Sequence, residues 1–207
     1  MSTRLFLVRH AESIWNAERL VQGQADPPLS KPGIEQAARL AEALSPRPIS
    51  AVYTSPLQRA RLTAATIARP HGLRPRLEPA LREISLGAWQ GRPLLARGRH
   101  SPLAGHRSFA DLSSDEAIDD PAVQAPSGES LFAALNRVAP VLDEIVSSHR
   151  EATIVLVTHS IIGRVALCHL LDAGLQLVPR LKLKVASISM VRIDGDGPVL
   201  ERLGETA

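Results

Sequence analysis

Two short, uninterrupted apolar runs, at residues 5–8 and 154–157, constrain the fold of this chain more than any other feature. Runs without polar alternation are typical of strands in a parallel sheet, because helices cover both faces of such a sheet. Each run is followed two residues later by a histidine, His10 or His159. Open α/β folds place their sites at the carboxyl ends of parallel strands. If the two strands are neighbours, both imidazoles therefore meet in one cleft.

Helical and strand-like patterns alternate along the rest of the chain. The expected helices lie at residues 34–44, 57–71, 130–148 and 161–171, and the further strands at 49–53, 183–193 and 199–203. Pro140 should kink the third helix. The Gly195 to Pro198 segment predicts a hairpin turn between the last two strands. The alternation predicts a three-layer α/β/α sandwich with a mainly parallel sheet and one antiparallel edge strand.

The segment at about residues 88–127 breaks this alternation, since it sustains no apolar period. We interpret it as a cap inserted into one domain of residues 1–207. Loops over a rigid sheet usually carry specificity, so we expect the cap to do so. A loose basic cluster in it consists of Arg97, Arg99, His100, His106 and Arg107. A solvated surface is favoured for this cluster over the steering of anionic substrates toward the cleft.

The composition narrows the class of protein. No apolar run in the 207 residues approaches the roughly 18 needed to span a bilayer, and the first residues contain no signal-peptide core. We therefore expect a cytoplasmic protein that binds no membrane. The 24 basic residues are balanced by 21 acidic ones, and two Trp, one Tyr and three Phe offer few stacking platforms, which argues against nucleic acid as a partner. The single cysteine, Cys168, excludes an internal disulfide and a cysteine-based metal cluster.

Histidine, arginine and glutamate at predicted strand ends point to phosphate chemistry. A neutral imidazole such as that of His10 can attack phosphorus near pH 7. The reaction also needs cations for the phosphoryl oxygens and an acid for the leaving group, and Arg9, Arg59 and Glu83 could supply them. Each residue has a structural alternative, because a lone histidine at a strand end, a cation on a helix or a paired carboxylate is common.

Six short sequence blocks are spread over most of the chain. They lie at residues 7–16, 22–37, 54–64, 81–91, 128–130 and 157–160. In this order they resemble the blocks of the histidine phosphatase superfamily, the phosphoglycerate mutase-like proteins. The resemblance implies that His10 accepts the phosphoryl group and that Glu83 protonates the leaving oxygen and later activates water. It also implies a phosphate pocket lined by Arg9, Arg59 and His159.

The resemblance further implies a set of substrate-binding residues. These are Asn16, Gln22, Gly23 and Ser160. Asn16 has the alternative role of capping a turn. Ser160 stands where the family usually has glycine, which could narrow the pocket if the backbone there must approach phosphate closely. Neither a metal nor another cofactor is implied, because arginine and histidine neutralise the phosphoryl oxygens.

The function that follows is a metal-independent phosphatase that hydrolyses a small phosphomonoester through a phosphohistidine on His10. Its partner would be a small phosphorylated metabolite, and a homodimer is an open alternative to a monomer. Two other functions stay open: a cofactor-dependent phosphoglycerate mutase and a non-catalytic protein that binds a phosphorylated ligand. The residues after Glu83 differ from the run typical of the mutases, which favours hydrolysis.

Overall fold

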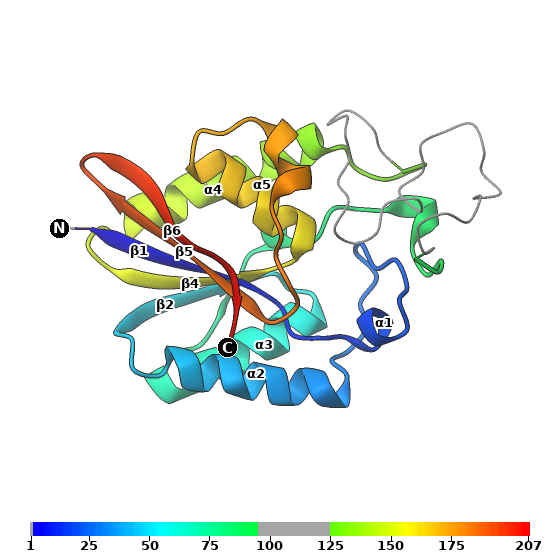
Figure 1. Ribbon diagram of the computed structural model, residues 1–207, viewed down its shortest axis with the longest axis horizontal. Coiled ribbons are helices and arrows are strands. Elements are labelled where there is room, and N and C mark those ends of the chain that lie inside the picture. Colours follow the sequence, from blue (N-terminus) through cyan, green and yellow to red (C-terminus); the bar gives the residue numbers. More distant parts are fainter. Residues whose placement is uncertain (1, 95–124) are drawn as a thin grey trace.

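The computed structural model of the protein describes residues 2–94 and 125–207. Within these residues, a six-stranded sheet of order β3-β2-β4-β1-β5-β6 forms the middle layer (Figure 1). The strands are β1 (Thr3–Arg9), β2 (Ile49–Thr54), β3 (Arg76–Leu77), β4 (Thr153–Thr158), β5 (Ser187–Asp194) and β6 (Gly197–Thr206). Strands β1 to β4 pair in parallel, whereas β5 is antiparallel to both β1 and β6. The predicted mainly parallel sheet with an antiparallel edge is confirmed.

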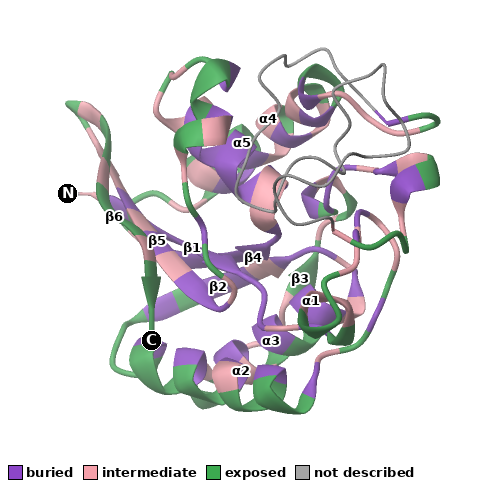
Figure 2. Ribbon diagram, turned by 45° about the vertical axis from the view of Figure 1, so that its right-hand side comes forward, coloured by how far each residue is buried: buried purple, intermediate pink, exposed green. Residues whose placement is uncertain are grey.

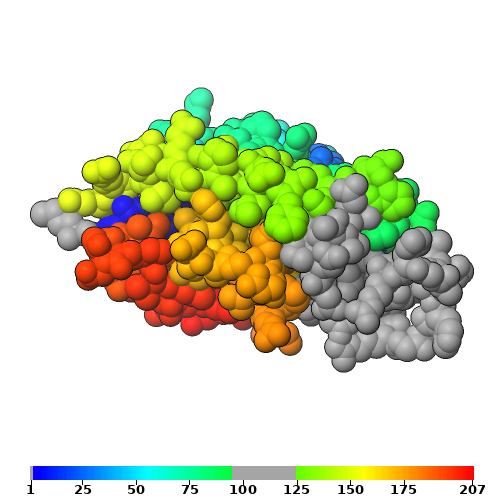
Figure 3. All heavy atoms as spheres, turned by 90° about the horizontal axis from the view of Figure 1, so that it is seen from above, coloured from blue at the N-terminus to red at the C-terminus, as the bar shows by residue number. Residues whose placement is uncertain are grey.

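Helices cover both faces of this sheet. Figure 1 shows α2 and α3 on one side and α4 and α5 on the other, and Figure 3 looks onto the α4 and α5 side from above. The α-helices are α1 (Ile14–Ala17), α2 (Lys31–Leu44), α3 (Gln58–Ala68), α4 (Leu131–Ser148) and α5 (Ser160–Leu170). The short 3₁₀ helices are η1 (Arg69–His71), η2 (Pro79–Leu81), η3 (Gly87–Trp89) and η5 (Leu175–Arg180). The predicted three layers are therefore confirmed.

Strand β1 shows why an unbroken apolar run predicts this arrangement. Leu5 and Leu7 belong to the core on the side of α4 and α5, whereas Phe6 and Val8 belong to the core on the side of α2 and α3. None of the four side chains is more than 5% exposed. Figure 2 shows the same burial along the central strands. Burying one such side chain contributes about 1.5–3 kcal/mol, so both faces of the strand favour the interior.

The ends of the helices follow from local hydrogen bonds. The Ser30 hydroxyl accepts the N–H of Gly33 at the start of α2, and the Ser130 hydroxyl accepts the N–H of Ala133 at the start of α4. Each serine satisfies a backbone donor that has no partner inside its helix. Helix α4 continues through Pro140 to its last residue, so the proline does not end it. The kink stays a prediction.

The chain between α5 and the hairpin differs from the prediction. Strand β5 begins at Ser187 rather than at residue 183. Just before it, the N–H of Ala186 donates to the carbonyl of His10, and Ala186 has a left-handed φ of 53°. The chain thus bends under the end of β1 before it enters the sheet. The predicted hairpin is confirmed, since Asp194 pairs with Gly197 across a two-residue turn.

Both ends of the predicted insertion are packed against the domain. Trp89 is 7% exposed and Ala125 is fully buried, and both belong to the core beneath α4 and α5. The N–H of Ala88 donates to the carbonyl of Pro126 at 3.1 Å, which closes the base of the insertion. The basic cluster of the cap falls at 95–124 and lies outside the described residues.

None of the described helices is long and apolar enough to cross a bilayer. The predicted cytoplasmic location and the homodimer stay predictions.

Candidate active site

The register of two strands brings the histidines together. Strands β1 and β4 are parallel neighbours, with Arg9 opposite Thr158, so the residues that follow the two strands lie side by side. The N–H of His10 continues this ladder by donating to the carbonyl of Thr158 at 2.9 Å. The imidazole centroids of His10 and His159 are 5.0 Å apart, and the residues are 3% and 0% exposed. The convergence expected from the strand pattern is confirmed.

The hydrogen bonds of His10 define which ring nitrogen carries a proton. Its Nδ1 lies 2.7 Å from the carbonyl oxygen of Ala11. A carbonyl oxygen only accepts, so Nδ1 is the donor and Nε2 keeps its lone pair. Burial and the positive charges of Arg59 and Arg9 lower the pKa of His10 well below its usual 6.5. The ring is therefore a neutral imidazole with a basic Nε2.

Arg59, in the first turn of α3, faces that Nε2. Its Nε donates to His10 Nε2 at 3.3 Å, while its other nitrogens donate to the carbonyls of Gly23 and Ala25 at 2.8 and 2.7 Å. Burial lowers the pKa of Arg59 to about 10, although the Glu83 carboxylate raises it. The guanidinium is still a cation at neutral pH. A fixed, planar cation beside a nucleophilic nitrogen is suited to bind phosphoryl oxygens.

His159 is the N-cap residue of α5, and its ring contacts Ser55. Its Nε2 is 2.8 Å from the Ser55 hydroxyl oxygen. Burial, followed by the charges of Arg59 and the neighbouring His10, lowers the pKa of His159 well below its usual value. Ser55 received no role from the sequence, although its place directly after a strand was the same signal that singled out the histidines.

Arg9 is the last residue of β1 and lies beside both histidines. Its Nη1 donates to the carbonyl of Leu183 at 2.6 Å, and the residue is 7% exposed. The guanidinium thus holds the segment before β5 against the site. Its charge also contributes to the lowered pKa of His10 and of His159.

Glu83 reaches the site from a loop rather than from a strand. One carboxylate oxygen accepts the N–H groups of Ile84 and Ile162 at 3.0 and 3.1 Å, and the other accepts that of Ile161 at 3.2 Å. The last two donors are in the first turn of α5, where backbone N–H groups have no partner within the helix. Glu83 therefore lies at the N-terminus of α5, next to His159.

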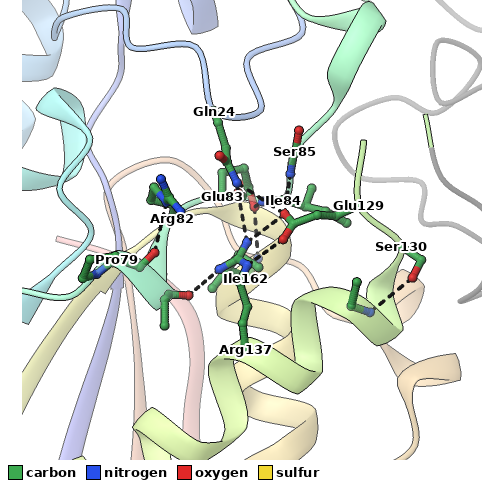
Figure 4. A network of polar contacts seen from close by, with 12 residues as sticks. Gln24, Pro79, Arg82, Glu83, Ile84, Ser85, Glu129, Ser130, Arg137 and Ile162 are labelled. Atoms are coloured by element: carbon green, nitrogen blue, oxygen red, sulfur yellow. Dashed lines mark hydrogen bonds and ion pairs between the residues drawn. The ribbon is translucent and has the colours of Figure 1, made fainter. Parts of the chain in front are cut away.

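A network of side chains holds the backbone around Glu83 (Figure 4). Arg137 of α4 donates from Nη2 to the carbonyl of Glu83 at 3.1 Å and from Nη1 to the carbonyl of Ala80. The same guanidinium donates from Nε and Nη2 to the two carboxylate oxygens of Glu129, at 2.7 and 3.0 Å. Glu129 in turn accepts the N–H of Ser85 at 2.7 Å. The backbone is thus held by hydrogen bonds both before Glu83, at Ala80, and after it, at Ser85.

Glu129 and Gln24 complete this network. Burial raises the pKa of the Glu129 carboxyl, but hydrogen bonds from Arg137 and from the Ser85 N–H outweigh that effect, so the pKa lies below its usual value. Gln24 donates from Nε2 to the Glu83 carbonyl at 3.0 Å and to Glu129 at 3.3 Å. Sequence alone offers no signal for Arg137 or Gln24, because the Glu83 carbonyl that both hold is 54 and 59 positions away from them.

Three of the predicted substrate-binding residues form one loop system. Asn16 accepts the N–H of Ser13 with its Oδ1 at 3.1 Å and so helps to cap α1. The Ser13 hydroxyl oxygen lies 3.1 Å from the same Oδ1 and 2.9 Å from Oε1 of Gln22, and its one proton is shared between these two acceptors. Gly23 has a left-handed φ of 53°, and a Cβ there would lie 2.9 Å from the backbone N of Leu86. Glycine is therefore favoured at this turn, whose carbonyl accepts from Arg59.

Ser160, the fourth predicted substrate-binding residue, is the first residue of α5. Its backbone lies outside the left-handed region, so the chain does not need glycine there. Arg164 donates to the Ser160 carbonyl at 3.1 Å and to its hydroxyl at 3.4 Å. The hydroxyl therefore faces the next turn of its own helix.

The assembled groups can transfer a phosphoryl group. A neutral imidazole with a lone pair on Nε2 lies beside a fixed guanidinium and a second imidazole, with a carboxylate at the start of the next helix. Among the described residues, no group of three or more His, Cys, Asp or Glu side chains is placed to hold a metal ion. A parallel sheet with such a site at its carboxyl edge is characteristic of an enzyme that acts on phosphate esters.

The family model comparison agrees with this class. The chain belongs to the histidine phosphatase superfamily (branch 1), whose model matches residues 5–206. The resemblance inferred from the sequence blocks is confirmed, and so is the enzyme class, a phosphoric monoester hydrolase.

Individual relatives cover nearly the whole chain. Phosphoserine phosphatase 1 of Hydrogenobacter thermophilus is 34% identical over 204 residues, which are 98% of this chain and 92% of that protein. A probable phosphoglycerate mutase GpmB of Yersinia enterocolitica is 32% identical over 213 residues, covering 99% and 94%. A mycobacterial glucosyl-3-phosphoglycerate phosphatase solved with VO3 has a TM-score of 0.83 and 28% identity, covering 97% of this chain and 98% of that one.

Proposed function

We propose that this protein hydrolyses a small phosphomonoester without a metal, through a phosphohistidine on Nε2 of His10. The observation that carries the proposal is the hydrogen bond from His10 Nδ1 to the carbonyl of Ala11. It leaves the lone pair on Nε2, and Arg59 lies against that nitrogen. A nucleophile and a cation for the attacked group are therefore already in place before substrate binds.

In the first step, Nε2 of His10 attacks phosphorus and the bond between phosphorus and the leaving oxygen breaks. Glu83, in its protonated form, donates a proton to that oxygen. Arg9, Arg59 and His159 bind the phosphoryl oxygens, whose negative charge is spread in the transition state. The bond from Nδ1 to the Ala11 carbonyl stabilises the positive charge of the phosphorylated ring.

In the second step, water attacks phosphorus and the bond to Nε2 breaks. The Glu83 carboxylate accepts the proton of that water, and inorganic phosphate leaves. We assign substrate contacts to the side chains of Asn16 and Gln22 and to the backbone of Gly23 and Ser160. The Oδ1 of Asn16 is used within α1, so its amide N–H group is the part that can donate to a phosphoryl oxygen.

The relatives suggest which phosphomonoesters to test. Their names mention phosphoserine, phosphoglycerate and glucosyl-3-phosphoglycerate, which all carry a carboxylate and a phosphate on three carbon atoms. We propose a small anionic metabolite of this kind as the substrate.

The test is phosphate release in the presence of EDTA from phosphoserine, 3-phosphoglycerate and p-nitrophenyl phosphate. We expect the wild type to release phosphate and His10→Ala to lose the activity by a factor on the order of 10⁴. Rapid quenching of the wild type should trap an acid-labile phosphoprotein that the variant lacks. Activity that requires a metal, or that survives in His10→Ala, would contradict the proposal.

A second candidate is a phosphoglycerate mutase, favoured by the name of the Yersinia relative. A mutase would convert 3-phosphoglycerate to 2-phosphoglycerate only with a bisphosphorylated primer and would release little phosphate. A protein that binds 3-phosphoglycerate but turns it over in neither way would be the non-catalytic alternative.

A further inference from the structure

The hydroxyl of Ser55 faces the second histidine of the site. Ser55 follows β2 directly and is fully buried, and its N–H continues the sheet by donating to the carbonyl of Val157 at 3.1 Å. Its hydroxyl oxygen accepts the N–H of Leu57 at 3.2 Å and lies 2.8 Å from Nε2 of His159. The sheet thus fixes the backbone of Ser55, and the N–H of Leu57 fixes its hydroxyl beside His159.

We infer that Ser55 is a positioning residue: its hydroxyl donates to Nε2 of His159 and so places the proton of that imidazole on Nδ1, where it can bind a phosphoryl oxygen. The inference rests on the proposed function, in which His159 lines the phosphate pocket. It goes further by stating which nitrogen binds and which residue decides this.

The hydrogen-bond partners of Ser55 favour this direction of donation. A serine hydroxyl has one proton to donate. The backbone N–H of Leu57 cannot accept it, so the acceptor among the described partners is Nε2 of His159. If Nε2 carried the proton instead, the buried Ser55 proton would have no acceptor in these contacts, which is costly.

The other nitrogen of His159 shows why the direction matters. Among the described residues, Nδ1 of His159 is a buried polar atom with no hydrogen-bond partner. It belongs to a ring whose centroid is 5.0 Å from that of the proposed nucleophile, His10. A proton on Nδ1 makes this atom a donor that can bind an anionic oxygen, whereas a lone pair would repel that oxygen.

The charge state of the ring makes the tautomer decisive. Burial and the charges of Arg59, His10 and Arg9 lower the pKa of His159 well below its usual value. A neutral imidazole has a single N–H, so a partner that binds one nitrogen decides the role of the other.

The experiment uses the full chain labelled with ¹⁵N-histidine, whose ring nitrogen shifts distinguish a protonated from an unprotonated nitrogen. The His159 signals are assigned by their loss in His159→Gln. We expect Nδ1 of His159 to be protonated in the wild type. In Ser55→Ala the signals should move toward the tautomer protonated on Nε2, and Ser55→Thr should restore the wild-type shifts.

The same variants are then tested for binding of orthovanadate and for phosphate release. Ser55→Ala should weaken vanadate binding and lower kcat by a factor on the order of ten, as expected for one hydrogen bond to a charged group. The matched control is Thr54→Val, which removes a neighbouring buried hydroxyl that donates to the Ser55 carbonyl at 3.1 Å and does not touch His159. It should leave the His159 shifts unchanged.

A wild-type His159 with its lone pair on Nδ1 would overturn the inference without any variant being needed. Unchanged shifts in a folded Ser55→Ala would overturn it as well. A wild type that shows the expected tautomer and response but releases no phosphate would leave the role of Ser55 intact and contradict the proposed function instead.

Discussion

The two halves of the candidate site are held by different kinds of contact. His10, Ser55 and His159 each follow a strand of the parallel sheet, so backbone hydrogen bonds place them. Glu83 follows no strand. Arg137 of α4 holds the Glu83 carbonyl, and Glu129 of the loop before α4 holds the N–H of Ser85 (Figure 4). The half of the site proposed to bind phosphate therefore depends on sheet register, whereas the half proposed to face the leaving group depends on a few side chains.

After His10→Ala, the largest effect is expected from Arg59→Met, since Arg59 lies beside His10 in the half of the site proposed to bind phosphate. Loss of the buried cation should lower kcat/KM by a factor on the order of 10³, because a preorganised charge no longer faces the phosphoryl oxygens. The loss should be similar for p-nitrophenyl phosphate and for an alkyl phosphate, since both carry the same phosphoryl group. Arg61→Met, on the exposed side of the same helix, is the matched control. If the loss of kcat/KM in Arg59→Met differed strongly between the two substrates, the division of the site into two halves would be contradicted.

Glu83→Gln should separate the two halves. We expect an alkyl phosphate to be hydrolysed slower by a factor on the order of 10², since general acid catalysis contributes about this much. Hydrolysis of p-nitrophenyl phosphate should change far less, because nitrophenolate leaves without a proton. The values of kcat/KM for the two substrates give the answer, because they report the phosphorylation of His10 and not the later attack of water, which Glu83 also assists. Equal losses on both would remove Glu83 from the role of the acid.

Arg137→Met should reproduce that dependence on the leaving group at a smaller scale. The guanidinium holds the carbonyls of Ala80 and Glu83, so its loss should misplace the acid and slow alkyl phosphate hydrolysis by a factor on the order of ten. The exposed Arg150→Met is the control. If Arg137 only stabilises the fold, both substrates will be affected alike and the pattern will be absent.

The buried histidines should make stability depend on pH. The pKa values of His10 and His159 are lowered in the folded protein, so the unfolded chain, with values near 6.5, binds protons first as the pH falls. The free energy of unfolding should be full above about pH 6.5 and fall below it, by at most about 1.4 kcal/mol per pH unit for each histidine. Urea unfolding at about pH 7.5, 6.5 and 5.5 measures this slope. The double variant His10→Gln and His159→Gln should flatten it, and an equal slope in wild type and variant would contradict the prediction.

The smallest effect is expected from Ser160→Gly. Because Ser160 has ordinary helical backbone and its hydroxyl faces Arg164, glycine should leave kcat/KM within about twofold and cost at most about 1 kcal/mol of stability. Rates and thermal unfolding of the variant test this. A large gain in activity would show that the serine narrows the pocket, as the family pattern suggested.

The sequence alone determined the parts of this protein that rest on local rules. Unbroken apolar runs predicted β1 and β4, Ser30 and a following amphipathic pattern predicted α2, and a glycine-rich turn predicted the hairpin of β5 and β6. The same rules placed His10 and His159 at one edge of the sheet. These features could be predicted because hydrophobic periodicity, helix capping and turn preferences depend on residues only a few positions apart.

Only the tertiary structure decided which residues hold these groups in place. Ser55 and His159 are 104 positions apart, and Arg137 and Glu83 are 54 apart. The two-residue strand β3 and the bend before β5 likewise exist because neighbours in space complete their hydrogen bonds. A buried donor or acceptor must find a partner, but nothing within a local stretch of sequence says which distant residue the fold will bring to it.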